Sequence, residues 1–221
     1  MSQGREPGLT SLAVAGSWRG IVRLYLRAAH RLRVEGLENL PAAPFVIVAN
    51  HSSHLDALTI AAALPRALGR RAFALAAGDT FFTSLPLATF AAFAINALPV
   101  WRKRTTARDI EALRARLHED GAVLILFPEG TRSRTGAMGR FQPGVGALIA
   151  GQPVPVVPCF LDGAFEAWPA SRRLPRPGPL HLRIGTPLHF DAVAPGRAGL
   201  AEVAGCCEAA VRELGGVQAE G

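Results

Sequence analysis

The sequence has few of the residues that build cross-linked or metal-binding proteins. Among its 221 residues there are one lysine, one tyrosine and three cysteines. The cysteines are Cys159, Cys206 and Cys207; their number is odd and their spacing fits no metal-ligand pattern, which indicates reduced thiols rather than a disulfide framework. Residues 1–8 are polar and lack the apolar core of a signal peptide. We therefore expect a protein of the cytoplasm that needs no metal ion and no bound cofactor.

Acidic residues are too few to balance the arginines. The formal net charge is +7 and the isoelectric point is about 10.8, so an anionic partner is expected. Hydrophobic residues make up 49% of the chain and its mean hydropathy is +0.22. This apolar balance favours an anionic membrane surface. Aromatic residues make up 7%, too few for the stacking platforms of a nucleic-acid groove, so no nucleic acid is expected.

Residues 9–33 are predicted to form a basic amphipathic helix. Its basic stripe consists of arginines four positions apart, Arg19, Arg23, Arg27 and Arg31. Trp18 and Tyr25 lie beside this stripe, and such a helix is typical of the membrane interface. The alternative is a surface helix whose arginines face water. We expect residues 1–33 to form a membrane-associating segment and residues 34–221 to form the main domain.

The main domain alternates predicted strands and helices. Strands are expected at 45–49, 122–127, 154–161 and 180–184, and helices at 54–63, 105–119 and 198–214. The apolar stretch 72–101 is predicted to be a buried helix followed by a short strand. Its uncharged part, 84–101, is near the lower length limit for a membrane span and contains two prolines. This order predicts an α/β fold with a largely parallel mixed sheet flanked by helices.

Residues 50–56 (NHSSHLD) follow the first predicted core strand. Residues five apart on a regular helix point about 140° away from each other. His51 and Asp56 therefore meet only if His51 lies in the turn and Asp56 in the first helical turn, with Ser52 or Ser53 as the N-cap. They would then form a pair able to take a proton from a hydroxyl. A capping box between Ser53 and Asp56 explains the same residues structurally, and His54 is the weaker histidine candidate.

Residues 127–134 (FPEGTRSR) follow a second predicted core strand. Ligands of open α/β sheets gather at the carboxyl ends of strands, so Glu129 is expected on the same sheet edge as His51. The turn offers the guanidinium groups of Arg132 and Arg134 to a phosphate. An ordinary solvated turn is the alternative for these charges.

Together the two motifs resemble the glycerolipid acyltransferase family, typified by lysophosphatidic acid acyltransferases. Four shorter stretches are also similar to that family, at residues 34–41, 97–102, 141–144 and 154–158. The resemblance covers about residues 34–190 and implies that 34–221 is an acyltransferase domain. It also implies the reaction, in which a fatty acyl chain passes from acyl-CoA or acyl carrier protein to the hydroxyl of a lyso-phospholipid. The default acceptor is 1-acyl-sn-glycerol 3-phosphate, and the product is then phosphatidic acid.

The resemblance also implies residue roles. His51 would be the general base, oriented by Asp56, and the acceptor would be bound by Arg102, Glu129, Gly130, Thr131 and Arg132. The implied location is the cytoplasmic face of the cell membrane, as a peripheral or monotopic protein. Gln142 replaces a lysine common in the family, which leaves another lyso-lipid acceptor open. A thioesterase and a non-catalytic membrane lipid-binding protein of the same fold are the further alternatives.

Overall fold

A computed structural model describes residues 9–77, 98–100 and 106–216 of the chain. Its strands form one sheet in the order β1-β7-β6-β2-β5-β3-β4. Among these strands every pairing is parallel except that of β6 with β7. The strands are β1 (Arg33–Glu35), β2 (Phe45–Ala49), β3 (Ala72–Ala77), β4 (Leu98–Val100), β5 (Val123–Leu126), β6 (Val156–Asp162) and β7 (His181–Ile184).

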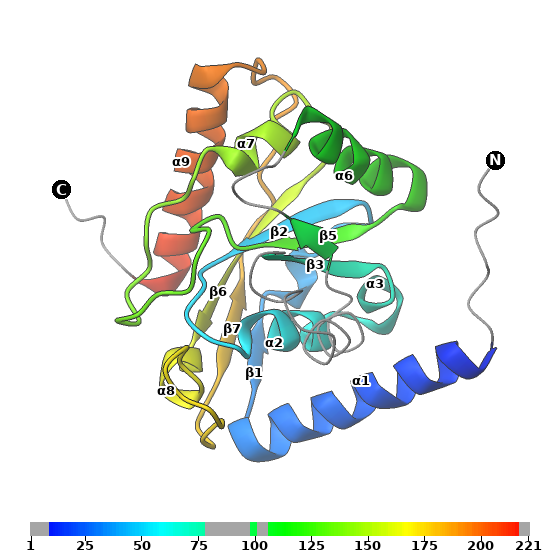
Figure 1. The fold of residues 1–221 in the computed structure, drawn as a ribbon, viewed down its shortest axis with the longest axis vertical. Helices are drawn as coiled ribbons and strands as arrows, with labels where there is room; N and C mark the ends of the chain where they lie inside the picture. Colours follow the sequence, from blue (N-terminus) through cyan, green and yellow to red (C-terminus); the bar gives the residue numbers. More distant parts are fainter. Residues whose placement is uncertain (1–8, 78–97, 101–105, 217–221) are drawn as a thin grey trace.

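Helices cover both faces of this sheet (Figure 1). On one face lie α1 (Leu9–His30), α2 (Asp56–Ala63) and α3 (Arg66–Gly69). On the other lie α6 (Ala107–Asp120), α7 (Gly144–Ile149) and α9 (Arg197–Gly215). The short helices η1 (Leu37–Asn39) and α8 (Ala164–Ala167) follow β1 and β6. The predicted α/β class with a largely parallel mixed sheet is confirmed.

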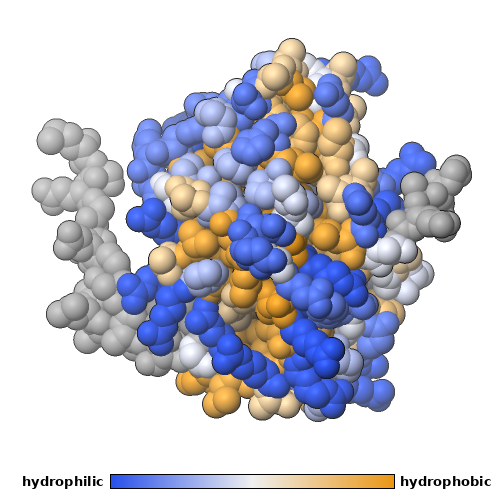
Figure 2. Space-filling view, turned by 180° about the vertical axis from the view of Figure 1, so that it is seen from behind, coloured by the Kyte–Doolittle hydropathy of each residue, from blue (hydrophilic) through white to orange (hydrophobic). Residues whose placement is uncertain are grey.

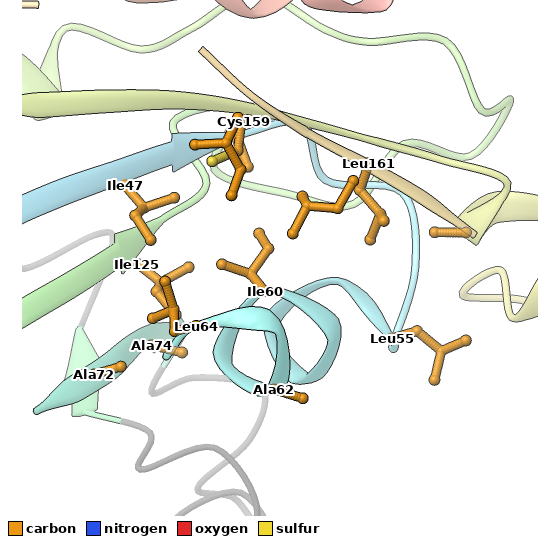
Figure 3. Close-up of a cluster of buried hydrophobic side chains, with 14 of the residues drawn as sticks. Ile47, Leu55, Ile60, Ala62, Leu64, Ala72, Ala74, Ile125, Cys159 and Leu161 are labelled. Carbon is orange, nitrogen blue, oxygen red and sulfur yellow. The ribbon is translucent and has the colours of Figure 1, made fainter. Parts of the chain in front are cut away.

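Strand β2 is buried on both faces, which is why its sequence is a continuous apolar run. Phe45, Ile47 and Ala49 belong to the hydrophobic cluster on the α2 side, and Val46 and Val48 belong to the cluster under α7 and α9. In the first cluster, the side chain of Ile60 in α2 points toward those of the central strands (Figure 3). The central position of β2 holds its carboxyl end, where the histidine motif begins, firmly in place.

Most predicted elements are present within one or two residues. The helix at 105–119 is α6, which begins with a capping box between Thr106 and Asp109. The helix expected over the first part of 72–101 is wrong, because residues 72–77 form strand β3, paired with β5. A short apolar run has no periodicity by which a strand can be distinguished from a buried helix. In the folded protein this run becomes a strand because it pairs with β5. Residues 78–97 and 101–105 lie outside the described residues.

Helix α1 is present and packs against the α2 side of the sheet. Val22 and Leu26 are buried there, in the same hydrophobic cluster as the central strands. Of the helices in the described residues, none is both long and apolar enough to cross a membrane. The division of the chain at residue 33 stays a prediction, and it falls within β1.

The arginines of α1 do not form one continuous exposed row, so the predicted basic stripe is wrong. Arg31 lies beyond the end of the helix with a positive φ of 45°. Arg23 turns inward and donates hydrogen bonds to the carbonyl oxygens of Ala62, at 2.6 Å, and Leu64. These carbonyls belong to the carboxyl end of α2, where a cation is favoured by the helix dipole and by unpaired acceptors. Arg27 is exposed.

Candidate active site

Asn50 extends the central strand pairing by one residue. Its side-chain amide donates to the carbonyl of Leu161 at 3.0 Å, and its side-chain oxygen accepts the Leu161 N–H at 2.8 Å. This pair of bonds imitates the backbone pairing of a strand and ties the end of β2 to β6. His51 therefore leaves the sheet at its carboxyl edge from a rigid anchor, as the sequence predicted.

His51 and Asp56 meet as predicted. Nδ1 of His51 lies 2.8 Å from Oδ2 of Asp56, with 19% of the histidine side chain exposed and none of the aspartate side chain. A carboxylate only accepts hydrogen bonds, so this contact places the proton on Nδ1 and leaves a lone pair on Nε2. The pair thus has the tautomer that a general base requires.

The predicted N-cap is wrong, because α2 begins later than expected. Leu55 is the N-cap residue and forms no side-chain cap, and Asp56 is the first helical residue. Oδ2 of Asp56 accepts the backbone N–H groups of Ser52, at 2.7 Å, and Ser53, at 2.8 Å. One oxygen therefore both orders the turn and orients His51, while the Ser53 hydroxyl contacts the Leu55 N–H and the Trp168 carbonyl, so the predicted capping box is not formed.

Phe127 supports the imidazole of His51 from one side. The two rings are stacked, with centroids 4.2 Å apart and planes 18° apart. Phe127 is the first residue after β5, the neighbour of β2 in the sheet. With Asp56 at its Nδ1 edge and Phe127 against its face, the imidazole has little freedom to rotate.

Glu129 is bound to backbone amides on both of its oxygens. Oε1 accepts the N–H of His51 at 2.7 Å, and Oε2 accepts the N–H of Gly139 at 2.9 Å. Burial raises the pKa of this carboxyl above its ordinary value. The Ser133 N–H donates to the carbonyl of His51 at 2.8 Å. Residues 129–133 therefore bind both the backbone N–H and the backbone carbonyl of His51.

Of the other predicted binding residues, Arg132 lies against the second histidine. Its Nη1 is 2.6 Å from Nδ1 and 2.8 Å from Nε2 of His54. Gly130 adopts the positive φ of 75° that the turn requires, and Thr131 is exposed. Arg102 lies outside the described residues. His54, the weaker histidine candidate in the sequence, is thus a direct neighbour of a predicted phosphate ligand.

The contacts between α9 and the loop that binds Glu129 could not be predicted from sequence. Oε2 of Glu208 accepts the N–H of Phe141 at 2.8 Å, and its Oε1 pairs with Arg212 Nε at 2.9 Å. Arg212 also donates to the carbonyls of Met138 and Gly139, at 3.2 and 3.4 Å. The loop that binds Glu129 is therefore fastened to a long helix. Its only sequence signal is an acid and a base four residues apart.

The candidate site lies within a stretch of the chain that matches a known family. A model of the acyltransferase family matches residues 31–162, which is more than half of the chain. The chain belongs to the acyltransferase family. The matched residues of this acyltransferase include both motifs that meet at His51.

Two relatives illustrate the similarity. The chloroplastic 1-acyl-sn-glycerol-3-phosphate acyltransferase LPAT1 of Arabidopsis thaliana is 32% identical over 165 residues, which cover 72% of this chain and 44% of the relative. A 1-acyl-sn-glycerol-3-phosphate acyltransferase of Pseudomonas aeruginosa is 29% identical over 171 residues, which cover 76% of this chain and 63% of the relative. The chain thus spans about half of the length of these relatives.

A solved structure shares the fold of this acyltransferase. The crystal structure of the 1-acyl-sn-glycerophosphate acyltransferase PlsC from Thermotoga maritima matches with a TM-score of 0.70 at 22% identity. The match covers 99% of this chain and 86% of that one. The likeness confirms the arrangement of sheet and helices.

Proposed function

We propose that this acyltransferase moves a fatty acyl chain from an acyl thioester to the hydroxyl of a lyso-phospholipid. The proposed acceptor is 1-acyl-sn-glycerol 3-phosphate, and the product is phosphatidic acid. The observation that carries the proposal is the 2.8 Å contact between His51 Nδ1 and Asp56 Oδ2 at the carboxyl edge of the sheet. The names of the two relatives, both 1-acyl-sn-glycerol-3-phosphate acyltransferases, support the choice of acceptor.

The reaction needs one base and no covalent enzyme intermediate. Nε2 of His51 takes the proton of the acceptor hydroxyl as its oxygen attacks the thioester carbonyl. The C–S bond then breaks, and the departing thiolate takes the proton from the imidazolium. Asp56 stabilises that imidazolium while it exists. A positioned base of this kind contributes about 10²–10⁴-fold to the rate.

Arg132 is the proposed ligand of the acceptor phosphate. A guanidinium binds a phosphate through two parallel hydrogen bonds, which fixes both position and orientation. In 1-acyl-sn-glycerol 3-phosphate the free hydroxyl and the phosphate ester are on adjacent carbon atoms. A phosphate held near the 129–133 turn therefore keeps the hydroxyl close to His51, whose carbonyl accepts the Ser133 N–H. Arg102 is proposed to contribute to the same phosphate site.

We also propose that α1 holds the protein on the cytoplasmic face of the cell membrane, as a peripheral protein. Its outer face carries large apolar side chains in water, with 60% of Ile21, 67% of Leu24 and 38% of Tyr25 exposed. Arg27 is exposed on the same helix and can contact anionic headgroups. Hydrophobic and hydrophilic residues lie side by side along the lower edge of the molecule, where α1 lies (Figure 2).

The test is product analysis with purified protein. Wild-type protein and His51→Ala are incubated with 1-acyl-sn-glycerol 3-phosphate and either acyl-CoA or acyl carrier protein charged with a fatty acid. The expected product is phosphatidic acid, with at least about 10²-fold less from His51→Ala. The faster donor identifies the thioester that the enzyme uses. Free fatty acid as the main product would show a thioesterase instead, and no product from either donor would contradict catalysis.

A further inference from the structure

His54 contacts both a cation and an aromatic ring. Arg132 Nη1 is within 2.8 Å of both ring nitrogens. The indole of Trp168 has its centroid 5.0 Å from that of the imidazole, with the planes 44° apart. His54 is half-buried in this position, three residues after the proposed base. It therefore links the proposed phosphate ligand to the scaffold.

Trp168 is itself held in place, so it can act as a fixed support. Its carbonyl accepts the backbone N–H of His54 at 3.2 Å and the hydroxyl of Ser53 at 2.8 Å. Its indole N–H donates to the carbonyl of Arg172 at 3.0 Å. Three hydrogen bonds thus tie the segment after α8 to the histidine turn and to its own loop. The imidazole of His54 rests on a rigid surface rather than on a mobile side chain.

The imidazole is uncharged at neutral pH. Burial and the positive charge of Arg132 lower the pKa of His54 to about 4. A neutral imidazole has one ring nitrogen that accepts a hydrogen bond, so one of the two short contacts with Arg132 Nη1 is a hydrogen bond donated by the guanidinium. A carboxylate in this place would orient the arginine as well, but it would offset the positive charge. A neutral acceptor orients the guanidinium without offsetting the charge that attracts an anion.

From this arrangement we infer that His54 is a positioning residue that holds Arg132 ready for the phosphomonoester of the acceptor. An arginine side chain loses rotamer entropy when it is fixed. When the side chain is fixed before the acceptor arrives, part of that entropy loss no longer weakens acceptor binding. His54 therefore sets the preference for phosphate-bearing over uncharged lyso-lipids. This inference rests on the proposed function, because it assigns the acceptor to the same site.

The experiment is a double-mutant cycle with two different replacements of His54. His54→Phe keeps an aromatic ring against Trp168 and removes the acceptor nitrogen. His54→Gln keeps an acceptor and removes the ring. Each is measured alone and combined with Arg132→Gln, by KM and kcat for 1-acyl-sn-glycerol 3-phosphate and for an uncharged monoacylglycerol. Melting temperatures of all variants confirm that they fold.

His54→Phe is expected to raise KM for the phosphate-bearing acceptor about tenfold, with kcat changed less than about threefold; tenfold corresponds to about 1.4 kcal/mol. His54→Gln should recover most of this loss, and in the Arg132→Gln background His54→Phe should change KM less than about twofold. KM for the monoacylglycerol should not change.

Two results would overturn the inference while wild-type transfer upholds the proposed function. One is an unchanged KM in His54→Phe, whether or not kcat falls. The other is an equal rise in KM with and without Arg132. If the wild-type protein shows no transfer to either acceptor, the proposed function fails and this inference with it.

Discussion

The backbone N–H of His51 donates a hydrogen bond of 2.7 Å to Oε1 of Glu129, a residue 78 positions further along the chain. This bond joins the two motifs of the sequence at the point where the proposed base leaves the sheet. Since the other oxygen of Glu129 holds Gly139, one carboxylate sets the position of His51 relative to the whole 129–139 loop. The motifs are thus parts of one structural unit, and the following experiments test its parts.

Replacing Asp56 with asparagine should separate the charge of this side chain from its contacts. In Asp56→Asn the amide oxygen can take the place of Oδ2 and keep its contacts with Ser52, Ser53 and His51, while the NH₂ group takes the place of Oδ1. The negative charge that stabilises the imidazolium of His51 is then lost. We expect kcat to fall by about 10²–10⁴-fold with little change in melting temperature. A variant with near wild-type kcat would contradict the role of Asp56.

Glu129→Gln should affect turnover more than acceptor binding. The glutamine oxygen can accept one of the two N–H groups, and its NH₂ group then faces the other, from His51 or Gly139. Loss of one such bond in a part-buried site costs about 1–3 kcal/mol in the free energy of unfolding. We expect kcat to fall while KM for the acceptor changes little. Glu202→Gln, at an exposed position of α9, is the matched control; a selective rise in KM would instead make Glu129 an acceptor ligand.

Arg23→Gln should destabilise the fold, and Arg27→Gln should not. Arg23 supplies donors to the carbonyls of Ala62 and Leu64 at the end of α2, whereas Arg27 is exposed. Unpaired carbonyls there cost about 1–3 kcal/mol, and each kcal/mol lowers Tm by about 2–4 °C in a domain of this size. Thermal unfolding of both variants measures the difference. Equal melting temperatures would show that Arg23 is an ordinary surface charge.

The contacts of α1 with a membrane should have an apolar and an electrostatic part. Leu24→Gln removes an exposed apolar side chain, so its binding to anionic vesicles should weaken similarly at low and high salt. Arg27→Gln removes a charge, so its binding should weaken more at low salt than at high salt. Vesicle sedimentation at two salt concentrations measures both. Wild-type binding by both variants would exclude this face of α1 as the membrane contact.

The depressed pKa of His54 predicts acid sensitivity. It lies at about 4, below the ordinary histidine value of 6.5, so between these values the unfolded chain binds a proton that the folded protein does not. Stability from this group is fully present above pH 6.5 and is lost as pH falls toward 4. Burial lowers the pKa of His30 as well, which acts in the same direction. The drop in Tm from about pH 7 to about pH 4.5 should be smaller in His54→Phe, and an equal drop would contradict the prediction.

Local patterns in the sequence were sufficient for much of the fold. A continuous apolar run predicted β2, because a central parallel strand is buried on both faces. The pattern of α6, with Leu113 and Leu117 on its inner face, predicted that helix and its buried side. The three-residue strand β1 was not predicted, and the strand at 72–77 was predicted as a helix. Such short segments take their structure from the neighbour with which they pair, and sequence shows no such neighbour.

The sequence by itself determined which chemistry the chain carries, since His51, Asp56 and Glu129 follow core strands in recognisable motifs. Only the tertiary structure decided which groups hold one another. It turned Arg23 inward, placed His54 against Arg132 and Trp168, and fastened the 138–141 loop to α9 through Glu208. A motif consists of residues close along the chain, whereas each of these contacts joins residues at least 39 positions apart. Their geometry exists only once the sheet and its helices have packed.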